Sequence, residues 1–107
     1  MEGITASKAA ELLHSDDADT TVLLDVREDV ELSMAAIDGA MHIPMGQIPA
    51  RIGELNPDQT IVVMCHTGGR SAQVATYLSQ QGFPDVFNLD GGIQAWSSSV
   101  DSTIPEY

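Results

Sequence analysis

The chain has 107 residues, of which 16 are acidic and 4 are basic, so its formal net charge is -12. This length allows one domain, and the single cysteine excludes an internal disulfide and any structural zinc site with two thiolate ligands. So few cations argue against binding nucleic acid or anionic lipid through charge. No apolar run approaches 18 residues, and Met1 to Lys8 lacks a signal-peptide layout. We therefore expect a cytoplasmic protein that does not span a membrane.

The first half of the chain predicts alternating helices and strands. Thr5 is a helix-capping residue ahead of an alanine- and leucine-rich stretch, and the aliphatic run at 22–26 is typical of a strand buried on both faces. The predicted elements are a helix over 6–13, a strand over 22–26, a weak helix over 28–36, a strand over 40–44 and a helix over 48–55.

The second half continues this alternation. Residues 61–64 form the clearest strand, 65–70 a turn, and 71–81 a helix closed by Gly82. Residues 86–89 predict a last strand, and Gly91-Gly92 leads into a short helix through Trp96. Strands separated by helices imply parallel crossovers and an α/β layered domain, in which ligands bind at the carboxyl ends of strands.

Acidic residues are distributed unevenly along the chain. Nine of them lie in residues 1–31, and residues 59–84 contain none. That acid-free stretch holds the single cysteine, Cys65, together with His66 and Arg70. It is therefore the part of the sequence that repels an anion least.

Cys65 directly follows the predicted strand over 61–64, and a glycine-rich turn and a helix come after it. Gly68 and Gly69 can adopt positive φ, which lets backbone N–H groups of the turn point at the sulfur. The start of the following helix adds unpaired N–H groups and the positive end of its dipole. We therefore predict a reactive Cys65 whose pKa is lowered by backbone amides first and by Arg70 second.

The sequence fixes no histidine–carboxylate partner for this thiolate. His66 is adjacent to Cys65, so its side chain is expected to point away from the sulfur, and His42 is more plausible as a structural residue. Amide hydrolysis is therefore a poor interpretation, and one cysteine excludes a dithiol cycle within the chain. The reaction that remains for the Cys65 thiolate is attack on a soft or anionic electrophile.

Four segments resemble the signature motifs of rhodanese domains, in that family's order. They are Leu24-Asp25-Val26-Arg27-Glu28, Gly39-Ala40-Met41-His42-Ile43-Pro44, Cys65-x-x-Gly68-x-Arg70-Ser71, and Leu89-Asp90-Gly91-Gly92-Ile93-Gln94-Ala95-Trp96. One departure is Ala35-Ala36 before Ile37, where the family often has Gly-His. The resemblance covers residues 22–96 best and implies a single rhodanese-like domain over 1–107, with a central, mainly parallel sheet and helices on both faces.

The resemblance also implies a sulfurtransferase that forms a persulfide on Cys65. The expected donor is a small anion such as thiosulfate or another persulfide, and the acceptor is a thiol, cyanide or a protein. We expect no metal, no cofactor and a monomer or weak homodimer. The candidate substrate-binding residues are those that follow the cysteine: His66, Thr67, Gly68, Gly69, Arg70 and Ser71.

Several alternatives stay open at this point. The domain could be a persulfide carrier or sensor that hands sulfur to a protein partner, or a non-catalytic interaction domain, which the intact Cys65 loop disfavours. The loop of the related cell-cycle phosphatases has five residues between its cysteine and its arginine, whereas four residues separate Cys65 from Arg70. Phosphatase activity or arsenate reduction is therefore a disfavoured alternative. Arg70 is expected to contact the sulfonate end of a donor, and the alternative is that it pairs with a distant carboxylate.

Other residues that stand out have structural interpretations. Asp25 and Arg27 are expected to form an ion pair or hydrogen bonds that tie loops together. Trp96 is expected to pack in the core or at an interface, Gly91 and Gly92 to serve backbone geometry, and Met41 and Met45 to border the pocket.

Overall fold

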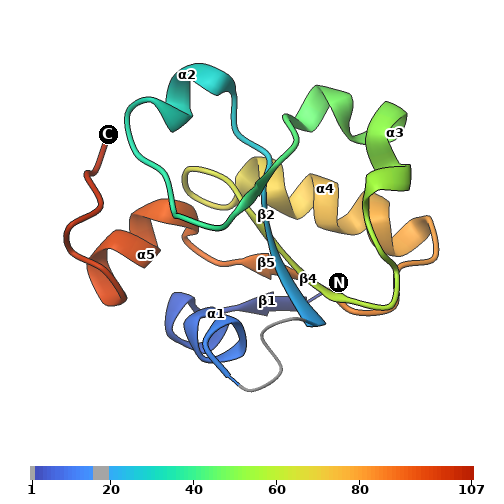
Figure 1. The fold of residues 1–107 in the computed structure, drawn as a ribbon, viewed down its shortest axis with the longest axis horizontal. Helices are drawn as coiled ribbons and strands as arrows, with labels where there is room; N and C mark the ends of the chain where they lie inside the picture. Colours follow the sequence, from blue (N-terminus) through green and yellow to red (C-terminus); the bar gives the residue numbers. More distant parts are fainter. Residues whose placement is uncertain (1, 16–19) are drawn as a thin grey trace.

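The computed structural model describes residues 2–15 and 20–107, which form one five-stranded sheet with helices on both faces (Figure 1). All pairings between neighbouring strands are parallel, and the strand order is β1-β5-β4-β2-β3. The elements in chain order are β1 (Glu2–Ile4), α1 (Ala6–Leu13), β2 (Thr21–Asp25), α2 (Asp29–Leu32), β3 (Met41–His42), the 3₁₀ turn η2 (Met45–Gln47), α3 (Ile48–Arg51), the 3₁₀ turn η3 (Ile52–Glu54), β4 (Thr60–Met64), α4 (Gly69–Gln80), β5 (Val86–Leu89) and α5 (Gly92–Ser99).

This architecture confirms the predicted α/β fold with a parallel sheet. Helices α1 and α5 lie together on one face, and α4 covers the other face (Figure 1). The predicted cap at Thr5 is also confirmed, because its hydroxyl accepts the backbone N–H of Lys8 at 3.1 Å.

Side chains that alternate along each central strand enter two separate apolar cores. Leu23 and Val62 face α1 and α5, whereas Leu24 and Val63 face α4. This arrangement explains the uninterrupted apolar runs 22–24 in β2 and 61–64 in β4, since a strand segment buried on both faces needs apolar residues at successive positions. Cys65, 1% exposed, belongs to the core on the α4 face.

Several boundaries differ from the prediction. Strand β1 was not predicted, because three residues at a sheet edge give too short a pattern. The predicted strand over 40–44 is limited to β3, and the predicted helix over 48–55 is divided into α3 and the 3₁₀ turn η3. Helix α4 begins at Gly69, two residues earlier than predicted, and α5 extends beyond Trp96 to Ser99.

The helix predicted over 28–36 was wrong beyond Leu32, and buried Arg27 supplies the reason. Its guanidinium pairs with Asp25 at 2.8 Å and also donates to the carbonyl of Ala35 at 2.8 Å. This hydrogen bond holds the segment after α2 against the end of β2, outside the helix, which spans only four residues. The expected Asp25–Arg27 ion pair is thereby confirmed, and it ties β2 to the segment after α2.

In the described ranges, no helix combines the length and the apolar character that crossing a bilayer requires. Trp96 is 4% exposed in the core under α5, which confirms its predicted packing role.

Candidate active site

The loop between β4 and α4 carries the candidate site. It begins with Cys65 at the carboxyl end of the central strand β4, between β5 and β2. That end of a parallel sheet is where α/β domains place their ligands. The predicted position of Cys65, at the junction of a buried strand and a glycine turn, is confirmed.

Gly68 shapes this turn. Its φ is 114°, in the left-handed region that only glycine adopts without strain, and it is the N-terminal cap residue of α4. In this conformation its N–H donates to Sγ of Cys65 at 3.0 Å. The glycine therefore aims one backbone donor at the sulfur.

Ser71 aims a second donor at the same atom. Its hydroxyl lies 3.3 Å from Sγ of Cys65 and its side chain is fully buried in the first turn of α4. The hydroxyl also lies 2.5 Å from Oδ1 of Asn88 and 3.2 Å from the carbonyl of Gly68. Asn88 in β5 therefore holds the serine in place beside the sulfur.

These donors decide the pKa of Cys65. Burial raises the pKa of the thiol. The hydroxyl of Ser71 and the backbone N–H groups of Ser71, Gly68 and Thr67 lower it, and together they outweigh burial, so the net pKa lies below the usual value. The predicted direction is confirmed. The largest single contribution that lowers the pKa is the Ser71 hydroxyl, which was not predicted, followed by the backbone N–H groups of Ser71, Gly68 and Thr67. Arg70 also interacts electrostatically with the thiolate.

Helix α5 fixes the backbone of the cysteine. The N–H of Ile93 donates to the carbonyl of Cys65 at 2.9 Å, and that of Gln94 donates to the carbonyl of His66 at 3.2 Å. Gly92, at φ 58°, allows this approach, because a Cβ atom there would lie 2.4 Å from both carbonyl oxygens. Gly91 is also at positive φ, 79°, so the prediction that both glycines serve backbone geometry is confirmed.

The ring of His66 stacks on Tyr107, with centroids 4.0 Å apart and planes 10° from parallel. The Tyr107 hydroxyl accepts from Nη1 of Arg27 at 3.0 Å and donates to Oε2 of Glu31 at 2.7 Å. Tyr107 therefore connects the loop to the buried Asp25–Arg27 pair and to α2.

Arg70 lies in the first turn of α4 and is engaged by Glu31. Its two terminal nitrogens lie 2.5 and 2.8 Å from the two carboxylate oxygens. The hydrogen bonds from Arg70 lower the pKa of Glu31 to about 2. This pairing with a distant carboxylate is the alternative that the sequence left open, and contact between Arg70 and a donor stays a prediction.

The remaining predicted residues occupy less constrained positions. Thr67 and Gly69 are exposed on the loop. Nε2 of His42 donates to the carbonyl of Arg27 at 2.7 Å, as expected of a structural residue. Met45 packs beside α4 against Val74 and Tyr77.

Sequence reasoning missed Glu31, Asn88 and Tyr107. Asn88 offered a signal, since it is a polar residue within the apolar run of β5. Glu31 and Tyr107 offered none, because their partners are distant in sequence.

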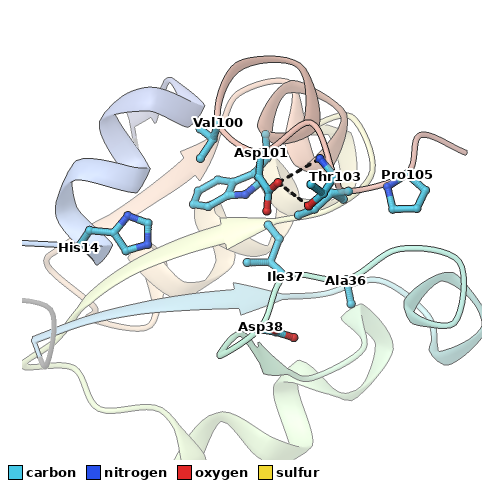
Figure 2. Close-up of a pocket in the computed structure, with 10 residues that line it drawn as sticks. His14, Ala36, Ile37, Asp38, Val100, Asp101, Thr103 and Pro105 are labelled. Carbon is cyan, nitrogen blue, oxygen red and sulfur yellow. Dashed lines mark hydrogen bonds between the residues drawn. The ribbon is translucent and has the colours of Figure 1, made fainter.

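A pocket of about 510 Å³ lies apart from this loop, between the end of α1, the segment before β3 and the segment after α5 (Figure 2). Asp101 at its rim accepts two hydrogen bonds from Thr103. Its lining residues are His14, Ala36, Ile37, Asp38, Trp96, Val100, Asp101, Thr103, Ile104 and Pro105. None of them belongs to the Cys65 loop.

Within residues 2–15 and 20–107, no cluster of three or more His, Cys, Asp or Glu side chains is placed to hold a metal ion.

Comparisons with known proteins agree with the geometry. A sulfurtransferase of Allochromatium vinosum is 41% identical over 81 residues, which is 76% of each chain. A chloroplastic rhodanese-like/PpiC domain-containing protein of Arabidopsis thaliana is 44% identical over 93 residues, or 83% of this chain but 31% of the plant protein. The crystal structure of a rhodanese-like domain protein from Staphylococcus aureus superposes with a TM-score of 0.81 at 33% identity, covering 100% of this chain and 99% of that one. The sequence profile of the Rhodanese-like domain matches residues 5–99, and this chain therefore belongs to the rhodanese-like family, among whose members are sulfurtransferases.

Proposed function

We propose that this domain is a sulfurtransferase that carries sulfane sulfur as a persulfide on Cys65. The observation that carries the proposal is the pair of donors aimed at Sγ, the N–H of Gly68 and the hydroxyl of Ser71. Both favour the thiolate, which is the nucleophilic form of cysteine. The sulfur lies at the end of β4, where a helix dipole adds further stabilisation.

With thiosulfate as donor, the Cys65 thiolate attacks the outer sulfur. A bond forms between Sγ and that sulfur, the bond to the sulfonate sulfur breaks, and sulfite leaves with the electron pair. Cyanide or a thiolate then attacks the terminal sulfur of the persulfide. This second step releases thiocyanate or a new persulfide and returns the Cys65 thiolate, so no external oxidant or reductant is consumed.

The loop supplies the contacts that we propose for the substrate. The N–H groups that lower the pKa of Cys65 would also hold the negative charge of the terminal sulfur. Thr67 and Gly69 are exposed and open to a donor or acceptor. The proposed substrate-binding set is His66, Thr67, Gly68, Gly69, Arg70 and Ser71.

A carrier or sensor that passes sulfur to a protein partner is the alternative within the same chemistry. Kinetics distinguish the two, since rapid turnover with thiosulfate and cyanide favours the enzyme and a single slow loading favours the carrier. The unit that we propose is one domain over residues 1–107, monomeric or weakly dimeric, which light scattering would test.

A phosphatase reaction is disfavoured by the carboxylate nearest Arg70. Such a reaction needs an acid to protonate its leaving group. Glu31 has a pKa of about 2, because Arg70 and Tyr107 both hydrogen-bond its carboxylate. It is therefore ionised at neutral pH and cannot donate the proton.

Intact mass spectrometry tests the proposed function. After incubation with thiosulfate or a thiol persulfide, the protein should gain the mass of one sulfur atom and lose it on addition of cyanide. Cys65→Ser should fold and gain nothing. A chain that never gains sulfur from either donor, or a Cys65→Ser variant that still transfers it, would contradict the proposal.

A further inference from the structure

The four lysine and arginine side chains, all within the described ranges, each have a carboxylate partner. Lys8 pairs with Glu11 and Arg51 with Glu54 on the surface, Arg27 pairs with Asp25 in the interior, and Arg70 pairs with Glu31 beside the loop. A small anionic donor therefore approaches a chain of charge -12 without meeting an unpaired lysine or arginine side chain.

Arg70 is the one of these cations whose field reaches the active sulfur. The negative charge of the Cys65 thiolate interacts electrostatically with its guanidinium. The Arg70 side chain is 36% exposed, so a donor can reach it. Arg27, by contrast, is fully buried. Arg70 is therefore the cation that a donor's sulfonate would have to use.

Glu31 occupies the face of Arg70 that presents two parallel N–H groups, and it is held there. Its side chain is only 13% exposed. Oε2 also accepts from the Tyr107 hydroxyl at 2.7 Å, and Oε1 also accepts from the backbone N–H of Glu28 at 3.1 Å. A carboxylate fixed from three directions has already lost the side-chain freedom that makes surface ion pairs weak.

We infer that Glu31 is a specificity-determining residue, an internal anion that competes with the sulfonate of a donor for Arg70. The inference rests on the proposed function. A doubly charged donor such as thiosulfate must displace Glu31 or bind next to its negative charge. A thiol persulfide, R–S–SH, needs no such contact, so the site favours it over thiosulfate.

The favoured reaction is balanced without any further reagent. The Cys65 thiolate attacks the outer sulfur of R–S–SH and forms a new S–S bond. The original S–S bond breaks, and the thiolate R–S⁻ leaves with the electron pair. The proton stays on the terminal sulfur, which is now attached to Cys65.

Glu31→Gln tests the inference, with thiosulfate and the persulfide of 2-mercaptoethanol as the two donors. The amide loses the charge and keeps one oxygen, which can accept from the backbone N–H of Glu28, while its NH₂ group takes the place of the oxygen that faces Tyr107. The KM for thiosulfate should fall by about tenfold, as expected when a charge-assisted donor pair is freed. The KM for the persulfide, which has no sulfonate group, should change by less than about twofold, since it does not use that pair.

Glu54→Gln is the matched control. It removes the same charge and also breaks an arginine–glutamate pair, but one outside the loop and on the surface. Both donors should keep their KM values in this variant. Equal changes for the two donors in Glu31→Gln, or an equal fall for thiosulfate in Glu54→Gln, would overturn the inference.

Two further results separate the possible failures. If neither donor places sulfur on Cys65 in the wild-type protein, the proposed function itself fails. If Glu31→Gln does not fold, as judged by circular dichroism, Tyr107→Phe replaces it, because it keeps a ring to stack on His66 and removes one bond to Glu31. The KM for thiosulfate should then fall by about threefold, and an unchanged value would overturn the inference.

Discussion

The hydroxyl of Ser71 and the sulfur of Cys65 are buried together, 3.3 Å apart. A serine hydroxyl has one proton to donate, and here three acceptors lie within reach: the sulfur, the carbonyl of Gly68 and Oδ1 of Asn88. A charged acceptor forms the stronger bond. Ionisation of Cys65 therefore draws the Ser71 proton toward the sulfur.

The first prediction is that Ser71→Ala raises the pKa of Cys65. The variant loses the largest of the contributions that lower this pKa and retains the backbone N–H groups. The rate of alkylation by iodoacetamide, measured against pH, should have its midpoint at higher pH than in the wild-type protein. Ser97→Ala is the control, because Ser97 is also buried in a helix but donates to the carbonyl of Ile104. An unshifted midpoint in Ser71→Ala would show that amides alone hold the thiolate.

The second prediction concerns Gly92, the residue through which α5 approaches the loop. Gly92→Ala should destabilise the fold by about 3 kcal/mol or more, since it combines positive φ with overlap of two carbonyl oxygens. Gly82→Ala is the control, because Gly82 also has positive φ, 95°, but has open space around it. That change should cost about 1 kcal/mol. Urea unfolding measures both, and equal losses would rule out the steric explanation.

The Cys65 loop could be predicted because its determinants are contiguous. A buried strand, a cysteine, glycines and a helix follow one another within residues 61–71, so local rules place the donors around the sulfur. The same holds for the cap at Thr5 and for β4. The rest depends on contacts between distant segments. Arg27 holds the segment after α2 through the carbonyl of Ala35, and Tyr107 reaches Glu31 across most of the chain. No local pattern contains either contact.

The third prediction addresses the buried pair of Asp25 and Arg27. Arg27→Met should destabilise the protein by about 3–5 kcal/mol, because it leaves the Asp25 carboxylate buried without its cation. Arg51→Met, which breaks a surface pair of the same type, should change stability little. Thermal and urea unfolding provide the comparison. If both variants lose the same stability, the interior pair is not what holds the segment after α2.

The fourth prediction is that acid lowers the stability of the fold by protonating Glu31. Its pKa is about 2 in the folded state and 4.5 as a model value. The unfolded chain therefore takes up a proton at higher pH than the folded one does. The stabilisation is complete above about pH 4.5 and is lost as the pH falls through 2. The side chain in Glu31→Gln does not titrate, so the melting temperature of this variant should fall less than that of the wild-type protein between pH 5 and pH 2. Parallel curves for the two proteins would contradict the pKa assignment.

The last prediction combines Arg70 with its partner in a double-mutant cycle. If Glu31 competes with a sulfonate for the guanidinium, Arg70→Ala removes a contact that the wild-type protein uses only in part. In the Glu31→Gln background the contact is fully available, so the same change should cost more. We expect a loss of about 1.5 kcal/mol in kcat/KM for thiosulfate there, at the low end for a charged hydrogen bond because Arg70 is partly exposed. The loss in the wild-type background should be smaller.

Arg70→Lys in the Glu31→Gln background refines this result. A lysine restores the charge but not the planar pair of N–H groups, so it should recover only part of the lost kcat/KM. Full recovery would mean that charge alone attracts the donor. Equal losses from Arg70→Ala in the two backgrounds would mean that Glu31 and Arg70 act on the donor independently, through their fields and without competition. A larger loss after removal of Glu31 is the result that only competition for the same N–H groups produces, since independent charges add.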